Sequence, residues 1–477
     1  MRSLSLLLVA GITAMGSLSG CGFLESVTEP SPVVLPPIID RDSVSAAIDR
    51  PDWQEYFSDD TLRGLIEIGL KNQFDLAIAL QRIESARANL YRQTSLLYPT
   101  VSIGGSTRIT KYGRYTSDFA GNAGTEIAQG QAVPNPLPDF FLGLQSTWEL
   151  DIAGKYRSLR DAAAQSYLAT VEGRRWAMTT LIADIAALYY SLRAQHEEEN
   201  TIKESITLQQ RALTLITVQK YAGRANELAV QQAQAQLFGS DALLLENNQR
   251  IVETESALNL LLGRVPQSIY VDTTGLASVR APRLRSGIKS NFLLNRPDIR
   301  KAELELEAAR SDVSAARAAF FPSLNITASA GFEAFNMRYL FLSPQSITYN
   351  ALGNLVAPLI NRSAIEADYQ SAKADQLIAY FEYQKSILNG FVEVRDEISS
   401  QYMLDTLIAV KTAEVAALTE AVRASDELFR TGRATYLEVI LAQQNALQTE
   451  LELTEVRKQR CISSIKLYTS LGGGWPD

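Results

Sequence analysis

The sequence has 477 residues, a formal net charge of −8 and a charged fraction of 21%, and it contains no block of basic residues. This composition argues against nucleic-acid binding, because nucleic-acid-binding domains carry a basic patch. The chain has two cysteines, Cys21 and Cys461. Since the Cys21 thiol is assigned below to acylation, one thiol remains, and an internal disulfide is excluded. Cys461 lies at multiples of seven from Ile440 and Tyr468, so we expect it to be buried in a helix seam.

The first twenty residues have the organisation of a secretory signal peptide. Arg2 precedes an apolar run from Leu4 to Ile12 that is too short to span a membrane, and small residues follow it. Leu18-Ser19-Gly20-Cys21 has the lipobox pattern of bacterial lipoproteins, in which the cysteine is acylated and begins the mature chain. The alternative is a chance cysteine behind an ordinary signal peptide. Gly22 in place of aspartate favours sorting to the outer membrane.

We predict that residues 21–56 form a lipidated N-terminal tether. The segment from Glu29 to Pro37 is rich in proline, and proline favours an extended backbone. We therefore expect an extended connection between the acylated Cys21 and the folded part of the chain.

The remainder of the chain is an internal duplication. Asn72–Pro99 aligns with Asn295–Pro322 at a constant offset of 223 residues. The motif Gly223-Arg224-Ala225 aligns with Gly432-Arg433-Ala434 at an offset of 209. A repeat of this length indicates one structural unit used twice. We predict a signal peptide over residues 1–20, a first repeat over 57–265, a linker over 266–290, a second repeat over 291–472 and a tail over 473–477.

Each repeat is expected to begin with a helix and a β-hairpin. Thr61–Leu97 has a helical pattern that Pro99 ends. From Pro99 to Thr110 apolar and polar residues alternate, and each repeat contains two such alternating runs. Runs of about ten residues match a tilted strand that crosses a bilayer. Because the repeat offset falls by fourteen between the two aligned blocks, we place a deletion of that size in the loop between the two strands of the second repeat.

Two long helices are expected to complete each repeat. Arg157–Tyr221 and Ala364–Arg430 lack proline and have about 65 residues each, which corresponds to about 100 Å of helix. Apolar residues recur every seven positions along them, which predicts coiled-coil packing. Gly223 and Gly432 fit the left-handed residue that ends a helix, so each helix pair should turn back sharply there.

Two hairpins give four strands, which are too few for one chain to close a barrel. Unpaired strand edges cannot be satisfied within a bilayer, and a closed barrel needs about eight strands or more. We therefore predict a mixed α/β membrane protein in which several chains share one barrel. The polar strand faces would line a lumen, and the long helices would continue it as a tube in the periplasm.

Several motifs carry a resemblance to a known family. They are the lipobox, Asn295-Arg296-Pro297-Asp298-Ile299, Ala318-Ala319-Phe320-Phe321-Pro322, Trp148-Glu149-Leu150-Asp151 and the two Gly-Arg-Ala motifs. Over essentially the whole mature chain the sequence resembles the outer membrane factor family, the TolC-like channels, and within it the lipoprotein branch that serves RND-type tripartite efflux pumps.

The resemblance implies both the assembly and its partners. The assembly is a homotrimer with a twelve-stranded β-barrel, four strands from each protomer, that continues into a periplasmic α-helical coiled-coil barrel. The implied partners are a periplasmic adaptor protein, an inner-membrane RND transporter and outer-membrane lipid. The implied function is an exit duct for drugs or other small toxic compounds, with no cofactor.

The resemblance also implies a periplasmic gate beside the second Gly-Arg-Ala motif. Leu437 matches an apolar constriction of the family, and Glu438 matches an acidic position. The sequence departs from the family at Leu441, where aspartate is common, and at Gln444, where arginine is frequent. We assign the gate to Leu437, Glu438 and Leu441, with the hypothesis that Glu438 from each protomer forms an acidic ring that favours cations. The alternative is that Glu438 is an ordinary solvated residue.

The two turns, Gly223-Arg224-Ala225 and Gly432-Arg433-Ala434, look like the adaptor-docking ends of the family. Their small residues permit close backbone approach, and an arginine can donate to carbonyls at the end of a partner helix. The alternative is a plain helix-reversing turn, and both readings can hold. The occurrence of the same three residues at both tips favours docking.

Other functions fit the sequence less well. The single histidine, His196, lies within a predicted helix, and the sequence shows no metal-binding spacing, nucleophile elbow or phosphate loop, so we expect no enzyme. A structural coiled-coil stalk would need no hairpins with a polar inner face. Type I protein secretion is the nearer alternative, but the lipobox and the Arg296-Pro297-Asp298 motif favour efflux of small molecules.

Overall fold

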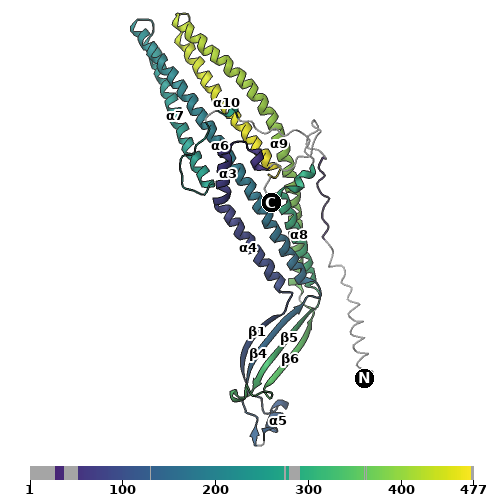
Figure 1. The fold of residues 1–477 in the computed structure, drawn as a ribbon. Helices are drawn as coiled ribbons and strands as arrows, with labels where there is room; N and C mark the ends of the chain where they lie inside the picture. Colours follow the sequence, from purple (N-terminus) through teal and green to yellow (C-terminus); the bar gives the residue numbers. More distant parts are fainter. Residues whose placement is uncertain are drawn as a thin grey trace. The chain divides into compact units, whose positions relative to one another are not determined.

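The computed structural model describes residues 27–36, 52–128, 130–272, 275–278, 290–358, 360 and 362–473 (Figure 1). The predicted signal peptide and the predicted acylation site Cys21 lie outside these residues. The chain divides into two compact units. The first contains Ser85–Tyr167 and Leu304–Phe381 with the residues up to Pro30, and the second contains Ser31–Glu84, Leu168–Glu303 and Glu382–Asp477.

The first unit contains a four-stranded antiparallel sheet with the order β1-β4-β5-β6. The strands are Thr100–Thr110 (β1), Leu137–Leu150 (β4), Ser323–Ala334 (β5) and Ile347–Val356 (β6). The sheet therefore consists of two hairpins, one from each repeat, that pair through β4 and β5. The outer edges of β1 and β6 have no strand partner among the described residues.

The pairing between the two hairpins requires glycine on both strands. Gly143 of β4 lies opposite Gly331 of β5. A Cβ atom on Gly143 would lie 2.5 Å from the carbonyl oxygen of Ala330, and one on Gly331 would collide with the carbonyl of Leu142. Any side chain at either position would push the strands apart, so this pair permits the close contact between the two repeats.

Apolar side chains on the edge strands are exposed. On β1 they include Val101 and Ile103, and on β6 they include Tyr349, Leu352 and Leu355; each is more than half exposed. Exposed apolar surface of this kind marks contact with lipid or with another protein chain. The described residues thus supply the sheet but no second layer over these side chains.

The two hairpin loops differ in length as the sequence predicted. The β1–β4 connection has 26 residues and contains α5 (Ser117–Ala123), β2 (Glu126–Ala128) and β3 (Gln131–Ala132). The β5–β6 connection has 12 residues and contains a 3-10 turn, η3 (Met337–Tyr339). The difference of fourteen residues equals the fall in the repeat offset. An insertion in such a loop leaves the strands undisturbed.

Two helical hairpins follow the same order in the two repeats. They are α6 (Lys155–Tyr221) with α7 (Glu227–Leu261), and α9 (Ser363–Arg430) with α10 (Tyr436–Ser470). The lengths of α6 and α9, 67 and 68 residues, confirm the two long helices that the sequence predicted. None of the helices in the described ranges is long and apolar enough to cross a membrane.

The prediction of one continuous helix over Thr61–Leu97 is wrong at Gln73. The segment forms two helices, α3 (Asp60–Asn72) and α4 (Phe74–Ser95), and the backbone of Gln73 between them is extended. The Gln73 N–H donates to the Gly69 carbonyl (2.9 Å), and its side-chain oxygen accepts from the Leu76 N–H (3.2 Å). Gln73 therefore ends one helix and caps the next.

The second repeat has its break at the corresponding position. Gln73 corresponds to Arg296 at the offset of 223. Arg296 lies between a 3-10 turn, η2 (Ser290–Asn295), and α8 (Pro297–Ala318). Pro297 is the first residue of α8, where its fixed backbone angle favours the helix and its missing N–H costs nothing.

The second unit has its largest apolar core around α3, α6, α7 and α10, together with the short helix α2 (Trp53–Tyr56) and the turn η1 (Leu276–Ser278). Fully buried side chains in this core include Leu62, Ile182 and Tyr468. Cys461 is buried among them, which confirms its prediction as a packing residue.

Arg296 joins α8 to three other helices of the second unit. Its side chain is 1% exposed, and its guanidinium donates to both carboxylate oxygens of Asp298 (3.0 and 2.8 Å). It also contacts the Glu393 carboxylate of α9 (2.8 Å) and donates to the Ser470 carbonyl of α10 (2.8 Å). The Trp176 ring of α6 lies 5.4 Å away. Because a buried charge is tolerated only when it is paired, this position depends on all four contacts.

We predict that Arg296→Ala lowers the free energy of unfolding by about 3 kcal/mol, because the two carboxylates lose their buried cation. Thermal unfolding of the purified protein in detergent measures the loss. Arg300→Ala is the matched control, since the Arg300 side chain is 48% exposed and pairs with Glu303 on its own helix. A loss in Arg296→Ala no larger than in the control would contradict the prediction.

Candidate functional site

The two Gly-Arg-Ala turns have the same backbone geometry. Gly223 has a φ angle of +71° and Gly432 one of +75°. The N–H of Arg224 donates to the Gln219 carbonyl, and the N–H of Arg433 donates to the Leu428 carbonyl, both at 2.8 Å. These are helix ends closed by a left-handed glycine, so the turn predicted at each of the two glycines is confirmed.

Both turns present a cationic side chain beside an open backbone. Arg224 and Arg433 are exposed, whereas Ala225 and Ala434 are partly buried. Apart from each glycine and its two chain neighbours, no described residue has an atom within 4 Å of the position that a Cβ atom on Gly223 or Gly432 would occupy. A partner could therefore approach the backbone of either turn closely while it contacts the guanidinium.

An apolar cluster close to the turns joins the two helical hairpins. Its buried residues are Ile216 of α6, Ala233 of α7, and Tyr436, Val439 and Ile440 of α10. Because the cluster draws on both hairpins, it resists their separation at this end. A hydrogen bond between the side chains of Gln236 (α7) and Gln444 (α10) adds a polar contact beside it.

The leucines of the predicted gate lie on the exposed side of α10. Leu437 and Leu441 are 52% and 48% exposed, whereas Val439 and Ile440 between them are buried. The two leucines are one helical turn apart and form a short apolar stripe. The same helix thus holds the hairpins together on one side and offers an apolar stripe on the other.

Glu438 has a structural role that the sequence analysis missed. Its carboxylate accepts hydrogen bonds from the backbone N–H (2.6 Å) and the hydroxyl (3.0 Å) of Thr435. This is the glutamate half of a capping box, and the Thr-x-x-Glu spacing that signals it is visible in the sequence. In the first repeat, Glu438 corresponds to Ala229, and Asn226 caps the helix with its own side chain. The carboxylate is therefore held at the start of α10 in the second repeat alone.

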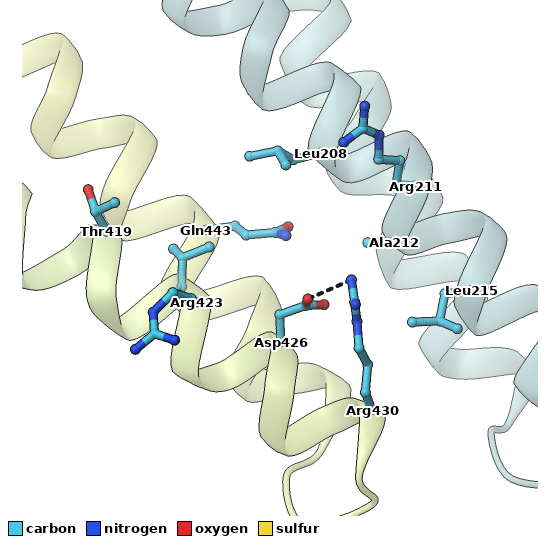
Figure 2. Close-up of a pocket in the computed structure, with 10 residues that line it drawn as sticks. Leu208, Arg211, Ala212, Leu215, Thr419, Arg423, Asp426, Arg430 and Gln443 are labelled. Atoms are coloured by element: carbon cyan, nitrogen blue, oxygen red, sulfur yellow. Dashed lines mark ion pairs between the residues drawn. The ribbon is translucent and has the colours of Figure 1, made fainter.

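A cleft lies between α6 on one side and α9 and α10 on the other (Figure 2). Its main cavity has a volume of about 580 Å³ and is lined by Leu208, Arg211, Ala212, Leu215, Thr419, Val422, Arg423, Asp426, Arg430 and Gln443. Figure 2 shows Asp426 and Arg430 side by side, joined by an ion pair of 2.8 Å. The sequence could not indicate this cleft, because each of its charged residues reads alone as part of a solvated helix face.

A second cavity of about 250 Å³ adjoins the first and shares four lining residues with it, Leu208, Thr419, Val422 and Gln443. Two carboxylates line this cavity, Glu204 from α6 and Glu450 from α10. Burial, and then the negative charge of Glu204, raise the pKa of Glu450 above its ordinary value. Two charged carboxylates at this position therefore oppose the packing of α6 on α10.

We predict that this carboxylate pair makes stability depend on pH. Because the pKa of Glu450 is raised in the folded chain, stability is lost as pH rises from about 4.5 through that raised pKa. Glu450→Gln should flatten this part of the profile and raise the unfolding temperature near pH 7 by about 2 °C.

Unfolding temperatures measured across this pH range check the prediction. Glu246→Gln is the matched control, since Glu246 is an exposed glutamate on α7. Equal pH slopes for the two variants would show that the pair has no such effect.

The open-edged sheet joined to long helical hairpins defines the class as a membrane-channel protein. The sequence model of the family described as outer membrane efflux protein matches residues 65–264 and 289–473. The match covers most of both repeats, and the chain belongs to this family.

Individual relatives are similar along almost their whole length. The cation efflux system protein CusC of Escherichia coli K12 is 28% identical over 466 residues, which cover 96% of this chain and 97% of CusC. The solvent efflux pump outer membrane protein SrpC of Pseudomonas putida is 30% identical over 437 residues, 91% of this chain and 90% of SrpC. A crystal structure of CusC superposes with a TM-score of 0.82 at 26% identity, covering 94% of this chain and 99% of that one.

These likenesses confirm the predicted family, fold class, outer-membrane location and efflux function. They favour efflux over the alternative of protein secretion. The division of the chain into domains and the roles of Cys21, the gate residues and the two turns are not tested by them and stay predictions.

Proposed function

We propose that this chain is the exit duct of a tripartite efflux pump, in which three copies close one twelve-stranded barrel across the outer membrane. The observation that carries the proposal is the open sheet: β1 and β6 end it without strand partners in the described part of the chain. A bilayer cannot satisfy such edges, so β1 of one copy must pair with β6 of the next. The helical hairpins then continue the barrel as a periplasmic tunnel.

The proposed duct is a passive conduit without a catalytic step. The named relatives belong to a cation efflux system and a solvent efflux pump, which supports small molecules or ions as the class of substrate. Its proposed partners are a periplasmic adaptor protein and an inner-membrane RND transporter, and the transporter would select the substrate. We retain Cys21 as the proposed acylation site, residues 57–265 and 291–472 as the two repeats, and 266–290 as the linker.

The proposed gate consists of Leu437, Glu438 and Leu441. The exposed leucine stripe would form an apolar constriction when three copies meet, and the capping hydrogen bonds would fix the position of each Glu438 carboxylate. Three carboxylates held near one axis would favour cations at the aperture. The apolar cluster beside the turns, with Tyr436 and Ile440, would hold the gate closed at rest.

Two substitutions separate the charge of Glu438 from its capping role. Glu438→Gln keeps a side chain that can cap the helix but removes the charge, so we expect the permeability ratio of cations to anions to fall about twofold or more while the unfolding temperature is unchanged. Glu438→Ala should lower both. Single-channel recordings in planar bilayers measure the ratio and also test channel formation itself. An unchanged ratio in Glu438→Gln would disprove the acidic ring.

The turns Gly223-Arg224-Ala225 and Gly432-Arg433-Ala434 are the proposed adaptor-docking ends. We expect the double variant Arg224→Glu/Arg433→Glu to abolish efflux, because the negative carboxylates would repel the partner carbonyls that the arginines would bind. The expected readout is a roughly tenfold fall in the inhibitory concentration of an exported compound. Trimer level in the outer membrane should not change, since both side chains are exposed. The control Arg224→Lys/Arg433→Lys keeps the charge and should retain efflux. Full resistance in the glutamate variant would contradict docking at these turns.

A further inference from the structure

The N-terminal segment Glu29–Leu35 is bound along the helices of the second repeat. Arg310 of α8 donates two hydrogen bonds to the Glu29 carboxylate (2.9 and 2.6 Å), and Gln376 of α9 donates another (2.8 Å). The hydrogen bonds from Arg310, which have the largest effect, and the one from Gln376 lower the pKa of Glu29. The Tyr380 hydroxyl donates to the Pro30 carbonyl (2.6 Å). Gln376 and Tyr380 are 7% and 5% exposed, so the segment is held by largely buried polar groups.

The following residues contact α9 within the second unit. The Val33 N–H donates to the side-chain oxygen of Gln384 (2.7 Å). Leu35 packs against an apolar cluster that includes Leu293 and Ile387. The segment therefore ends on an apolar contact and is fixed by hydrogen bonds at its start and middle.

The spacing of these contacts fits an extended chain that runs parallel to α9. Four residues separate Glu29 from Val33, and eight separate their partners Gln376 and Gln384. At about 3.1 Å per residue for an extended chain and 1.5 Å for a helix, both distances are about 12 Å. The match in rise lets successive groups of the segment meet successive turns of one helix face.

The first repeat does not offer the same set of side chains. At the offset of 209, the residues Gln376, Tyr380 and Gln384 correspond to Tyr167, Val171 and Arg175. Arg310 has a counterpart in Arg87 at the offset of 223, but the Glu29 carboxylate pairs with Arg310. Three of the four residues that bind the N-terminal segment in the second repeat are therefore replaced by other residues in the first repeat.

We propose that Glu29–Leu35 is a docking strap that binds α8 and α9 of its own chain and so limits how far the acylated Cys21 can lie from the β-sheet. The proposal rests on the acylation proposed above. Its partner is a segment of this chain, recognised by a carboxylate–guanidinium pair and by hydrogen bonds from α9.

Chain geometry shows that the docked strap leaves little slack. Eight Cα–Cα steps join Cys21 to Glu29, a span of at most about 28 Å. From Arg310, eight helical residues lead to Ala318, and hydrogen-bonded turns follow as far as Phe321, a rise of about 18 Å. Two further steps to the start of β5 at Ser323 add at most about 7 Å, so the distance is about 25 Å. A fully extended spacer of about 28 Å can therefore span this distance, whereas a spacer of half that length is too short for it.

The test shortens the spacer in the full-length protein. Val33→Cys and Gln384→Cys are introduced together and treated with a short bismaleimide; Cys461 is buried and does not compete. Removal of residues 24–27 leaves four Cα–Cα steps, about 14 Å. We expect the cross-link within one chain to fall about tenfold in the shortened, acylated protein. It should return when that protein carries Cys21→Ser and is exported behind a signal peptide without a lipobox, so that no acyl group and no additional thiol is present.

A charge exchange tests the binding site itself. Glu29→Arg should lower the cross-link, and Arg310→Glu added to Glu29→Arg should restore it. Arg87→Glu, at the matching position of the first repeat, is the control and should leave the cross-link unchanged.

Two results would overturn the proposal: a cross-link that forms between chains, or one that persists undiminished in the shortened, acylated protein. Mass spectrometry of the N-terminal peptide reports acylation separately, and channel conductance reports the proposed function. These two measurements distinguish a failure of the strap proposal from a failure of the proposed acylation or of the proposed channel function.

Discussion

The backbone hydrogen bonds of the sheet are the constraint on which the assembly depends. Within the described residues, one chain pairs its two hairpins through β4 and β5 but leaves the outer edges of β1 and β6 without partners. In water such edges could bind solvent, whereas in hydrocarbon each unpaired group costs several kcal/mol. The exposed apolar side chains of β1 and β6 favour contact with lipid or protein over contact with water. A sheet of this kind is complete only in an oligomer.

Duplication provides two similar units, and the two differ where one copy of a feature suffices. The glycine pair Gly143 and Gly331 and the two left-handed turns are features that both repeats must keep. Glu438, in contrast, has Ala229 as its counterpart, and the side chains of α9 that bind the N-terminal segment have no equivalents on α6. A trimer of such chains would contain six similar repeats in its walls. Its gate residues and its N-terminal segments would be present only three times, once in each chain.

Much of this fold could be predicted because its signals are local. Alternation predicted the strands, heptad spacing predicted α6 and α9, and glycine predicted their ends. The break at Gln73 could not be predicted, because glutamine is a good helix former and its capping role depends on where its side chain folds back. The cleft lies between α6 of the first repeat and the α9–α10 hairpin of the second, so no window of the sequence contains it. The capping box at Thr435 and Glu438 was visible but was overlooked beside the functional reading of Glu438.

The unequal hairpin loops have a consequence for the outside of the cell. The 26-residue connection folds into its own helix and short hairpin, whereas the 12-residue connection contains only the 3-10 turn η3. In the proposed trimer, three large loops would alternate with three small ones around the mouth of the duct. Antibodies or phages that approach the channel would then meet a rim with three raised lobes, built almost entirely from the first repeat, and this rim could change during evolution without affecting the pump below it.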